Sequence, residues 1–97
     1  ALPFGRLAAL VVSGGDRLST EAFAKSLAAT APFTDEVKVL GPAEAPLAVV
    51  RGRHRFRLLV KSSRAFDLSG YLREWLAHGP KPKGKLALEI VGSVRCV

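Results

Sequence analysis

The chain has 97 residues, of which 48% are hydrophobic and 24% are charged, and its formal net charge at pH 7 is +7. This length and composition are typical of one globular domain with a single core, so we expect residues 1–97 to form one domain. No apolar run approaches the roughly 18 residues of a membrane-spanning helix, so we expect no membrane partner. One cysteine, Cys96, excludes an internal disulfide and a multi-cysteine metal site, and it fits a reducing cytoplasm.

The first half of the chain predicts a strand, a helix and a second strand. Apolar residues occupy both alternating faces of residues 6–14, which is typical of a central strand buried on both sides. Asp16 or Ser19 can cap the helix that follows, and Pro32 ends it. Residues 36–41 alternate and predict a short strand. PAEAP, residues 42–46, predicts a stiff connector because proline cannot join a sheet ladder.

The second half predicts a strand, a helix and a last strand. Period-2 alternation predicts a strand over residues 51–61. Asp67 is expected to cap a helix with one apolar face, which is formed by Leu68, Tyr71, Leu72, Trp75 and Leu76. PKPKGK, residues 80–85, is a basic loop, and residues 86–91 predict the last strand. The order β-α-β-β-α-β predicts an α+β fold of the ferredoxin-like, split βαβ type. It has a four-stranded antiparallel sheet, strands one and three central, and both helices on one face.

Positive charge is concentrated in the second half of the chain. Residues 1–50 carry four Lys/Arg and five Asp/Glu, whereas residues 51–97 carry eleven and three. Because alternate strand side chains point to opposite faces, His54 and Phe56 are expected to face the helices. The opposite, helix-free face should carry a ladder of four arginines: Arg51, Arg53, Arg55 and Arg57. Such a ladder favours contact with a polyanion, or burial against an acidic domain, over a solvated basic face.

The candidate nucleic-acid contacts combine this ladder with nearby lysines. They are Arg51, Arg53, Arg55, Arg57, Lys61, Lys81 and Lys83. We find no catalytic constellation. The SGG sequence at residues 13–15 lacks the lysine and the spacing of a phosphate-binding loop. The residues alone predict a basic α+β binding module without metal, cofactor or catalysis. A free-standing RNA-binding or ribosome-associated protein of similar topology is the alternative.

Two stretches resemble a known family. LPFGRLA, residues 2–8, and VLGPAEAPLAVVRGRHRFRLLVK, residues 39–61, are similar to the C-terminal domain of primosomal protein N′, the PriA replication-restart helicases of bacteria. The most specific part is the RGR-aromatic-R-aromatic core after GPA-x-AP. The resemblance implies a ferredoxin-like domain that follows helicase lobes, in a protein that uses ATP, Mg²⁺ and Zn²⁺. The lack of methionine agrees with a fragment or a processed product.

The resemblance also implies partners and a second site. This domain is expected to help bind forked or single-stranded DNA and to contact the helicase lobes of the same chain. It is also expected to bind the acidic tail of single-stranded DNA-binding protein, with Arg64 and Lys61 as the corresponding basic residues. The sequence departs from the family pattern at its end, where residues 92–97 read GSVRCV instead of an Asp-x-Asp-Pro-like tail.

Overall fold

The third strand of this fold has alternating buried and half-buried side chains, and each of the two helices begins at an aspartate cap. The computed structural model describes residues 5–91, apart from the side chains of residues 46–48 and 50. Within that range the elements are β1 (Arg6–Gly14), α1 (Arg17–Ala29), β2 (Val37–Val50), β3 (Arg53–Ser62), α2 (Leu68–His78) and β4 (Ala87–Val91). The described strands form one antiparallel sheet in the order β2-β3-β1-β4. The predicted α+β order and the central position of the first and third strands are confirmed.

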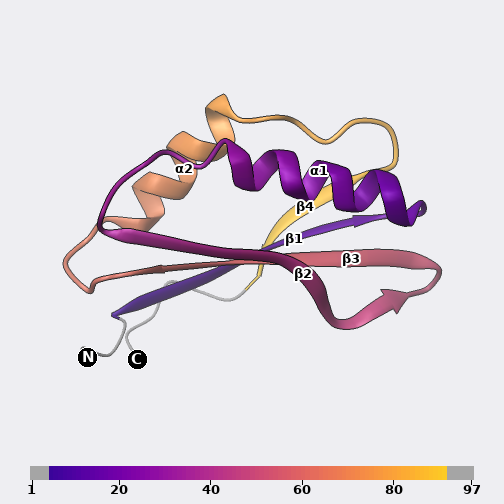
Figure 1. The fold of residues 1–97 in the computed structure, drawn as a ribbon, viewed down its shortest axis with the longest axis horizontal. Helices are drawn as coiled ribbons and strands as arrows, with labels where there is room; N and C mark the ends of the chain where they lie inside the picture. Colours follow the sequence, from indigo (N-terminus) through magenta and orange to yellow (C-terminus); the bar gives the residue numbers. More distant parts are fainter. Residues whose placement is uncertain (1–4, 92–97) are drawn as a thin grey trace.

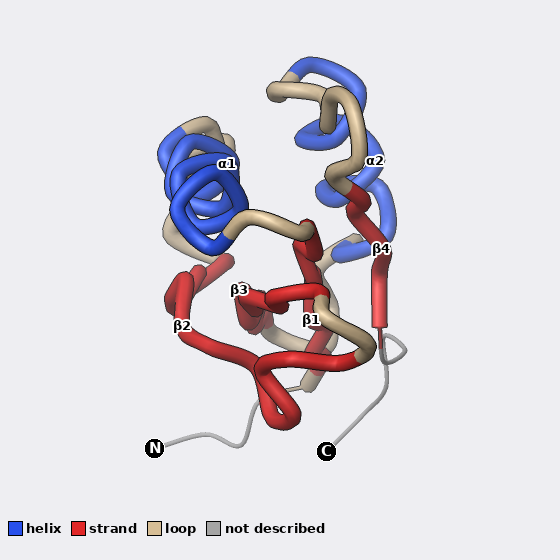
Figure 2. The backbone as a smooth tube through the Cα atoms, turned by 90° about the vertical axis from the view of Figure 1, so that its right-hand side faces the viewer, coloured by secondary structure: helices blue, strands red, loops and turns tan. Residues whose placement is uncertain are grey.

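The helices α1 and α2 lie side by side on one face of the sheet (Figures 1 and 2). Asp16 caps α1 by accepting a hydrogen bond of 2.8 Å from the backbone N–H of Ser19, as expected. Asp67 caps α2 in the same way, with Gly70 as the donor at 3.0 Å. Helix α1 ends at Ala29, three residues before Pro32.

The core fills the space between the helices and the sheet. Leu10 of β1 and Leu58 of β3 are opposite each other in the register and are fully buried. Trp75 of α2 is 1% exposed, and Leu27 of α1 is fully buried. Val11 is 3% exposed although it points to the other face. The first strand is therefore buried on both sides at its centre, as its composition predicts.

The prediction of a connector at residues 42–46 was wrong. Strand β2 continues through this segment to Val50, with register shifts between Leu40 and Ala43 and between Glu44 and Val49. Because β2 is an edge strand, its prolines need not donate to a neighbour, and such bulges accommodate extra residues. An ion pair of 3.0 Å from Arg17 to Glu44 joins this segment to α1.

The predicted start of the third strand was also wrong. Strand β3 begins at Arg53, which pairs with Val50, so Arg51 and Gly52 form a two-residue turn. Their φ angles of 54° and 77° are both positive, as a type I′ hairpin turn requires. Arg51 is therefore a turn residue and not the first member of a strand ladder.

Candidate nucleic-acid interface

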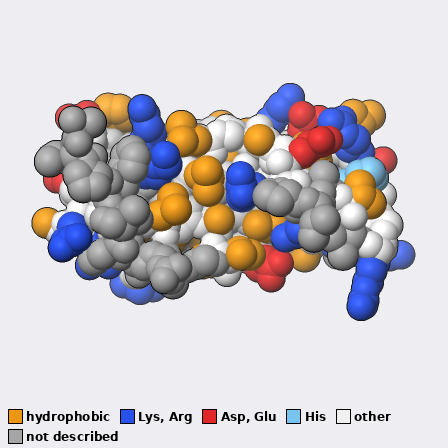
Figure 3. Space-filling model, turned by 90° about the horizontal axis from the view of Figure 1, so that it is seen from below, with side chains coloured by type: hydrophobic (Ala, Val, Ile, Leu, Met, Phe, Trp, Pro, Cys, Tyr) orange, Lys and Arg blue, Asp and Glu red, His pale blue; other side chains and the backbone are white. Residues whose placement is uncertain are grey.

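The arginines of β3 project from the sheet face that carries no helix. Phe56 and Leu58 lie in the core, so the alternate residues Arg53, Arg55 and Arg57 point the other way. All three are half-buried. Figure 3 shows this face, with hydrophobic side chains near its centre and Lys and Arg side chains beside them. We call the helix-free face that carries Arg53, Arg55 and Arg57 the arginine face.

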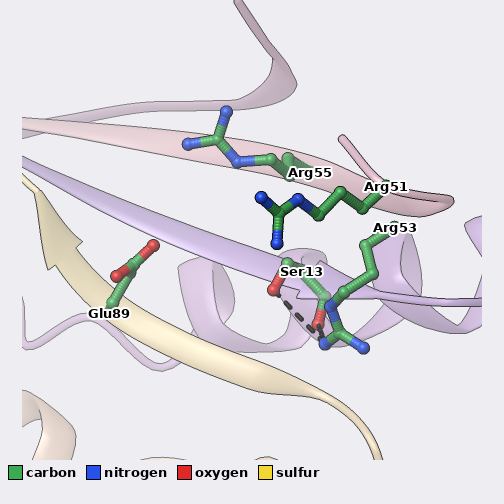
Figure 4. Close-up of a pocket in the computed structure, with 5 residues that line it drawn as sticks. All are labelled: Ser13, Arg51, Arg53, Arg55 and Glu89. Atoms are coloured by element: carbon green, nitrogen blue, oxygen red, sulfur yellow. Dashed lines mark hydrogen bonds between the residues drawn. The ribbon is translucent and has the colours of Figure 1, made fainter. Parts of the chain in front are cut away.

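One end of the arginine face forms a shallow cavity of about 300 Å³. We call it the arginine pocket; its lining residues are Ser13, Arg51, Arg53, Arg55 and Glu89. Arg51 reaches it from the β2–β3 turn, and Glu89 enters from β4 (Figure 4). Arg51 therefore lies beside Arg53 and Arg55, as the sequence predicted, although it belongs to the turn and not to the strand. Guanidiniums gathered in this way suit an anionic ligand with several oxygen acceptors.

Arg53 is engaged by backbone and side-chain acceptors within this pocket. Its Nη2 donates to the carbonyl oxygen of Ser13 at 3.1 Å and to Ser13 Oγ at 3.4 Å (Figure 4). The same nitrogen donates to the carbonyl oxygen of Lys85 at 2.6 Å. Arg53 therefore joins β3, β1 and the segment that enters β4.

An apolar groove of about 450 Å³ continues from the pocket along the helix-free face. Arg55 and Arg57 form part of its wall, and apolar residues form the rest: Leu7, Ala9, Val11, Ala45, Leu59 and Val91. We did not predict this groove from the sequence. Its signal is the second apolar face of residues 6–14, whose Leu7, Ala9 and Val11 lie on the side away from the helices.

Lys61 and Arg64 lie at the other end of β3. Lys61 is half-buried and pairs with Leu7 of β1, whereas Arg64 is exposed just beyond the strand. Arg6 Nε donates a hydrogen bond of 2.8 Å to the Arg64 carbonyl oxygen. Next to it, a Cβ placed on Gly5 would lie only 2.2 Å from the Arg64 Cα atom. The backbone of Arg64 is thus fixed by close contact with the first strand.

The predicted lysines of the loop do not share one location. We call residues 79–86 the lysine loop. Lys81 Nζ donates to the carbonyl oxygens of Leu76 and Ala77, so it caps the end of α2 on the helix side of the sheet. Lys83 is exposed farther along the loop. The carbonyl oxygen of Lys85, a residue absent from the predicted site, accepts a hydrogen bond from Arg53.

Two ionisable groups with shifted pKa values belong to the helices and their caps. Hydrogen bonds from the Ser19 hydroxyl and backbone lower the pKa of Asp16. Burial raises the pKa of Tyr71, whose hydroxyl donates to the Pro32 carbonyl oxygen at 2.6 Å. Within residues 5–91 we find no cluster of three or more His, Cys, Asp or Glu that could hold a metal, and no helix able to cross a membrane. Cys96 and the divergent residues 92–97 lie outside the described part.

The fold and this surface define a basic, ferredoxin-like α+β domain with an arginine-bearing open sheet face. Residues 2–94 match the family described as the primosomal protein N C-terminal domain, and the chain belongs to this family. Similar curated proteins include the replication restart protein PriA of Rickettsia typhi, which is 36% identical over 75 residues. The proteins of the same name from Rickettsia felis and Rickettsia conorii are 32% identical over 75 residues.

These matches cover only part of the relatives. Each alignment spans 77% of this chain but 11% of the length of the Rickettsia protein. The chain is therefore similar to a small portion of a much longer replication restart protein. Family membership also favours the resemblance over the alternative of a free-standing RNA-binding or ribosome-associated protein.

Proposed function

We propose that this chain is a non-catalytic module of a replication restart protein and contributes to binding of forked or single-stranded DNA. The arginine pocket carries the proposal. It brings Arg51 and Arg55 together around one cavity beside Arg53, and Glu89 is the acidic lining residue. A DNA phosphate presents several acceptor oxygens, which the planar donors of arginine match better than a single ammonium does.

The rest of the surface would extend this contact along a strand of DNA. Arg57 follows Arg55 on the same face, and Lys61 continues the row toward the end of β3. Successive residues on one face of a strand are about 7 Å apart, close to the spacing of phosphates along an extended single strand. Because phosphates carry no sequence information, the module would bind with little sequence preference.

A titration of labelled single-stranded and forked DNA at several salt concentrations tests this proposal. With about four phosphates engaged, log K against log salt should have a slope near −3, at roughly −0.7 per phosphate for single strands. Arg73→Gln provides a matched control, because Arg73 is an exposed arginine of helix α2. Binding that is undetectable at low salt, or that does not change with salt, would contradict the proposal.

We also propose that Arg64 and Lys61 contribute to docking the acidic tail of single-stranded DNA-binding protein. Arg64 is exposed, and its backbone is held by Arg6 and by the close approach of Gly5. A guanidinium on a fixed backbone loses less conformational freedom when it pairs with a carboxylate. Helix α2 begins at Leu68, four residues beyond Arg64, and adds a positive helix end nearby. A peptide titration with an Arg64 variant tests this role.

Catalysis and cofactors are proposed to belong to the remainder of the longer protein. The helicase lobes of the same chain would supply the sites for ATP, Mg²⁺ and Zn²⁺, and they would contact this module. A replication restart protein acts on the chromosome, so we propose the bacterial cytoplasm as its location. Purified residues 1–97 should neither hydrolyse ATP nor retain zinc; stoichiometric zinc or ATP turnover would contradict this assignment.

A further inference from the structure

The geometry points to Arg53 as a positioning residue that holds the lysine loop against the arginine pocket, so that Lys83 and Lys85 act in the same DNA contact. This inference rests on the proposed function, because it concerns how the DNA-binding surface is assembled. It assigns different work to two arginines of one strand. Arg53 orders a loop, whereas Arg57, four residues farther along β3, contacts DNA directly.

The contacts of Arg53 cross the sheet. Arg53 belongs to β3, its acceptor Ser13 belongs to the neighbouring β1, and Lys85 precedes β4 on the far side of β1. The contact of 2.6 Å to the Lys85 carbonyl oxygen is a charge-assisted hydrogen bond. Strand β4 begins only at Ala87, so this bond fixes a peptide of the loop and not of the sheet ladder.

The lysine loop is fixed at its two ends. Near α2, Lys81 caps the last carbonyl oxygens of the helix. Near β4, Leu86 N donates to the Lys83 carbonyl oxygen at 3.1 Å, and Gly84 between them has a φ of 62°. This tight turn presents Lys83 and Lys85 in the stretch that Arg53 holds. Both lysines are exposed, which leaves their ammonium groups able to meet a phosphate beyond the pocket.

An alternative role for Arg53 is direct phosphate binding, and the two roles predict different coupling. If Arg53 positions the loop, removing it should also remove the benefit of Lys83 and Lys85. If Arg53 binds phosphate independently, the loss of binding free energy from removing Arg53 and the loss from removing the two lysines should add. Residues that act through one another show such non-additivity in a double-mutant cycle, whereas independent sites do not.

The test is a cycle of Arg53→Gln and Lys83→Gln/Lys85→Gln, measured as binding to a single-stranded oligonucleotide over a range of salt. In the wild-type background, losing the two lysines should reduce the magnitude of the salt slope by roughly 0.7 for each phosphate contact that they make. In the Arg53→Gln background the same change should have almost no effect. Arg57→Gln is the matched control, and its cycle with the lysine pair should be additive.

Amide hydrogen exchange provides a readout without DNA. Arg53→Gln should accelerate exchange at Leu86, whose N–H is bonded within the loop, while amides of β1 such as that of Leu10 stay protected. If Arg53→Gln fails to fold, Arg53→Lys serves in both measurements, because lysine keeps the charge but lacks the planar fork.

The outcomes separate the two proposals. Wild-type protein that binds no DNA at low salt would contradict the proposed function. Wild-type protein that binds normally but gives an additive cycle for Arg53 and the lysine pair would overturn only this inference. Unchanged exchange at Leu86 in the Arg53 variant would overturn it as well. Non-additivity together with faster exchange is the expected result.

Discussion

The indole Nε1 of Trp75 donates a hydrogen bond of 3.0 Å to the carbonyl oxygen of Leu27, which joins α2 to α1 at the centre of the core. A second contact of 3.3 Å reaches Thr30 Oγ1 at the end of α1. Trp75 is 1% exposed and thus both fills the core and satisfies a polar atom there. This side chain therefore connects the two helices within the core.

Trp75→Ala should therefore destabilise the domain by about 3–5 kcal/mol, because it leaves a large cavity and removes the contact to Leu27. Urea unfolding followed by circular dichroism measures this loss. Tyr71→Phe, which removes only the hydroxyl bonded to Pro32, is the matched control and should cost roughly 1 kcal/mol. A Trp75→Ala cost below that of Tyr71→Phe would show that the helices are held by other contacts.

Gly5 is required where β1 passes the backbone of Arg64. Gly5→Ala would place a Cβ 2.2 Å from Arg64 Cα, and backbone atoms cannot move away cheaply. We expect a loss of about 1–3 kcal/mol, as for other overpacked sites. Gly15→Ala is the control, because nothing lies within 4 Å of a Cβ at that position. Equal stability of the two variants would mean that the Arg64 segment adjusts without cost.

The cap of α1 should make stability depend on pH. Hydrogen bonds from the Ser19 hydroxyl and backbone lower the pKa of Asp16 below its usual value of 3.8. This stabilisation is complete above that usual value and is lost as the pH falls through the lower, folded-state pKa. The advantage in midpoint temperature of wild type over Asp16→Ala should thus stay constant near neutral pH and shrink in acid. An advantage that grows in acid would refute this account.

The elements with local signals were predictable from the sequence. The apolar run of β1 and the caps Asp16 and Asp67 each depend on residues close together in the chain. The end of β2 and the turn at Arg51 were not predicted, because two prolines obscured an edge strand that pairs with β3 through two register shifts. Had that strand been extended to Val50, Arg51-Gly52 would have been the natural two-residue hairpin loop.

The residues of the candidate site were predictable from the sequence, but their hydrogen-bond partners were not. Alternation alone places Arg55 and Arg57 on the helix-free face. The partners of Arg53 could not be foreseen, because Ser13 and Lys85 lie 40 and 32 residues away and accept through backbone oxygens that every residue has. From the sequence alone, Lys81 was grouped with the arginines because of its charge. In the structure Lys81 instead caps the end of α2, on the helix side of the sheet.

Arg64→Ala should weaken binding of an acidic peptide that ends in Phe by about 1–3 kcal/mol, since a charge-assisted contact is lost. The titration should use a longer chain that includes the helicase lobes, because the proposed docking site combines this module with them. Lys25→Ala, an exposed lysine of helix α1, is the control and should leave the affinity unchanged. Equal affinity of wild type and Arg64→Ala would remove Arg64 from the docking site.

The salt dependence of DNA binding by Arg55→Gln/Arg57→Gln tests the central claim most directly. Both side chains line the helix-free face and lie outside the helix-packed core, so the variant should keep its fold by circular dichroism. The magnitude of the salt slope should fall by about 1.4, at roughly 0.7 per lost phosphate contact, while Arg73→Gln leaves it unchanged. A folded double variant with the wild-type slope and affinity would contradict the claim that the arginine face binds DNA.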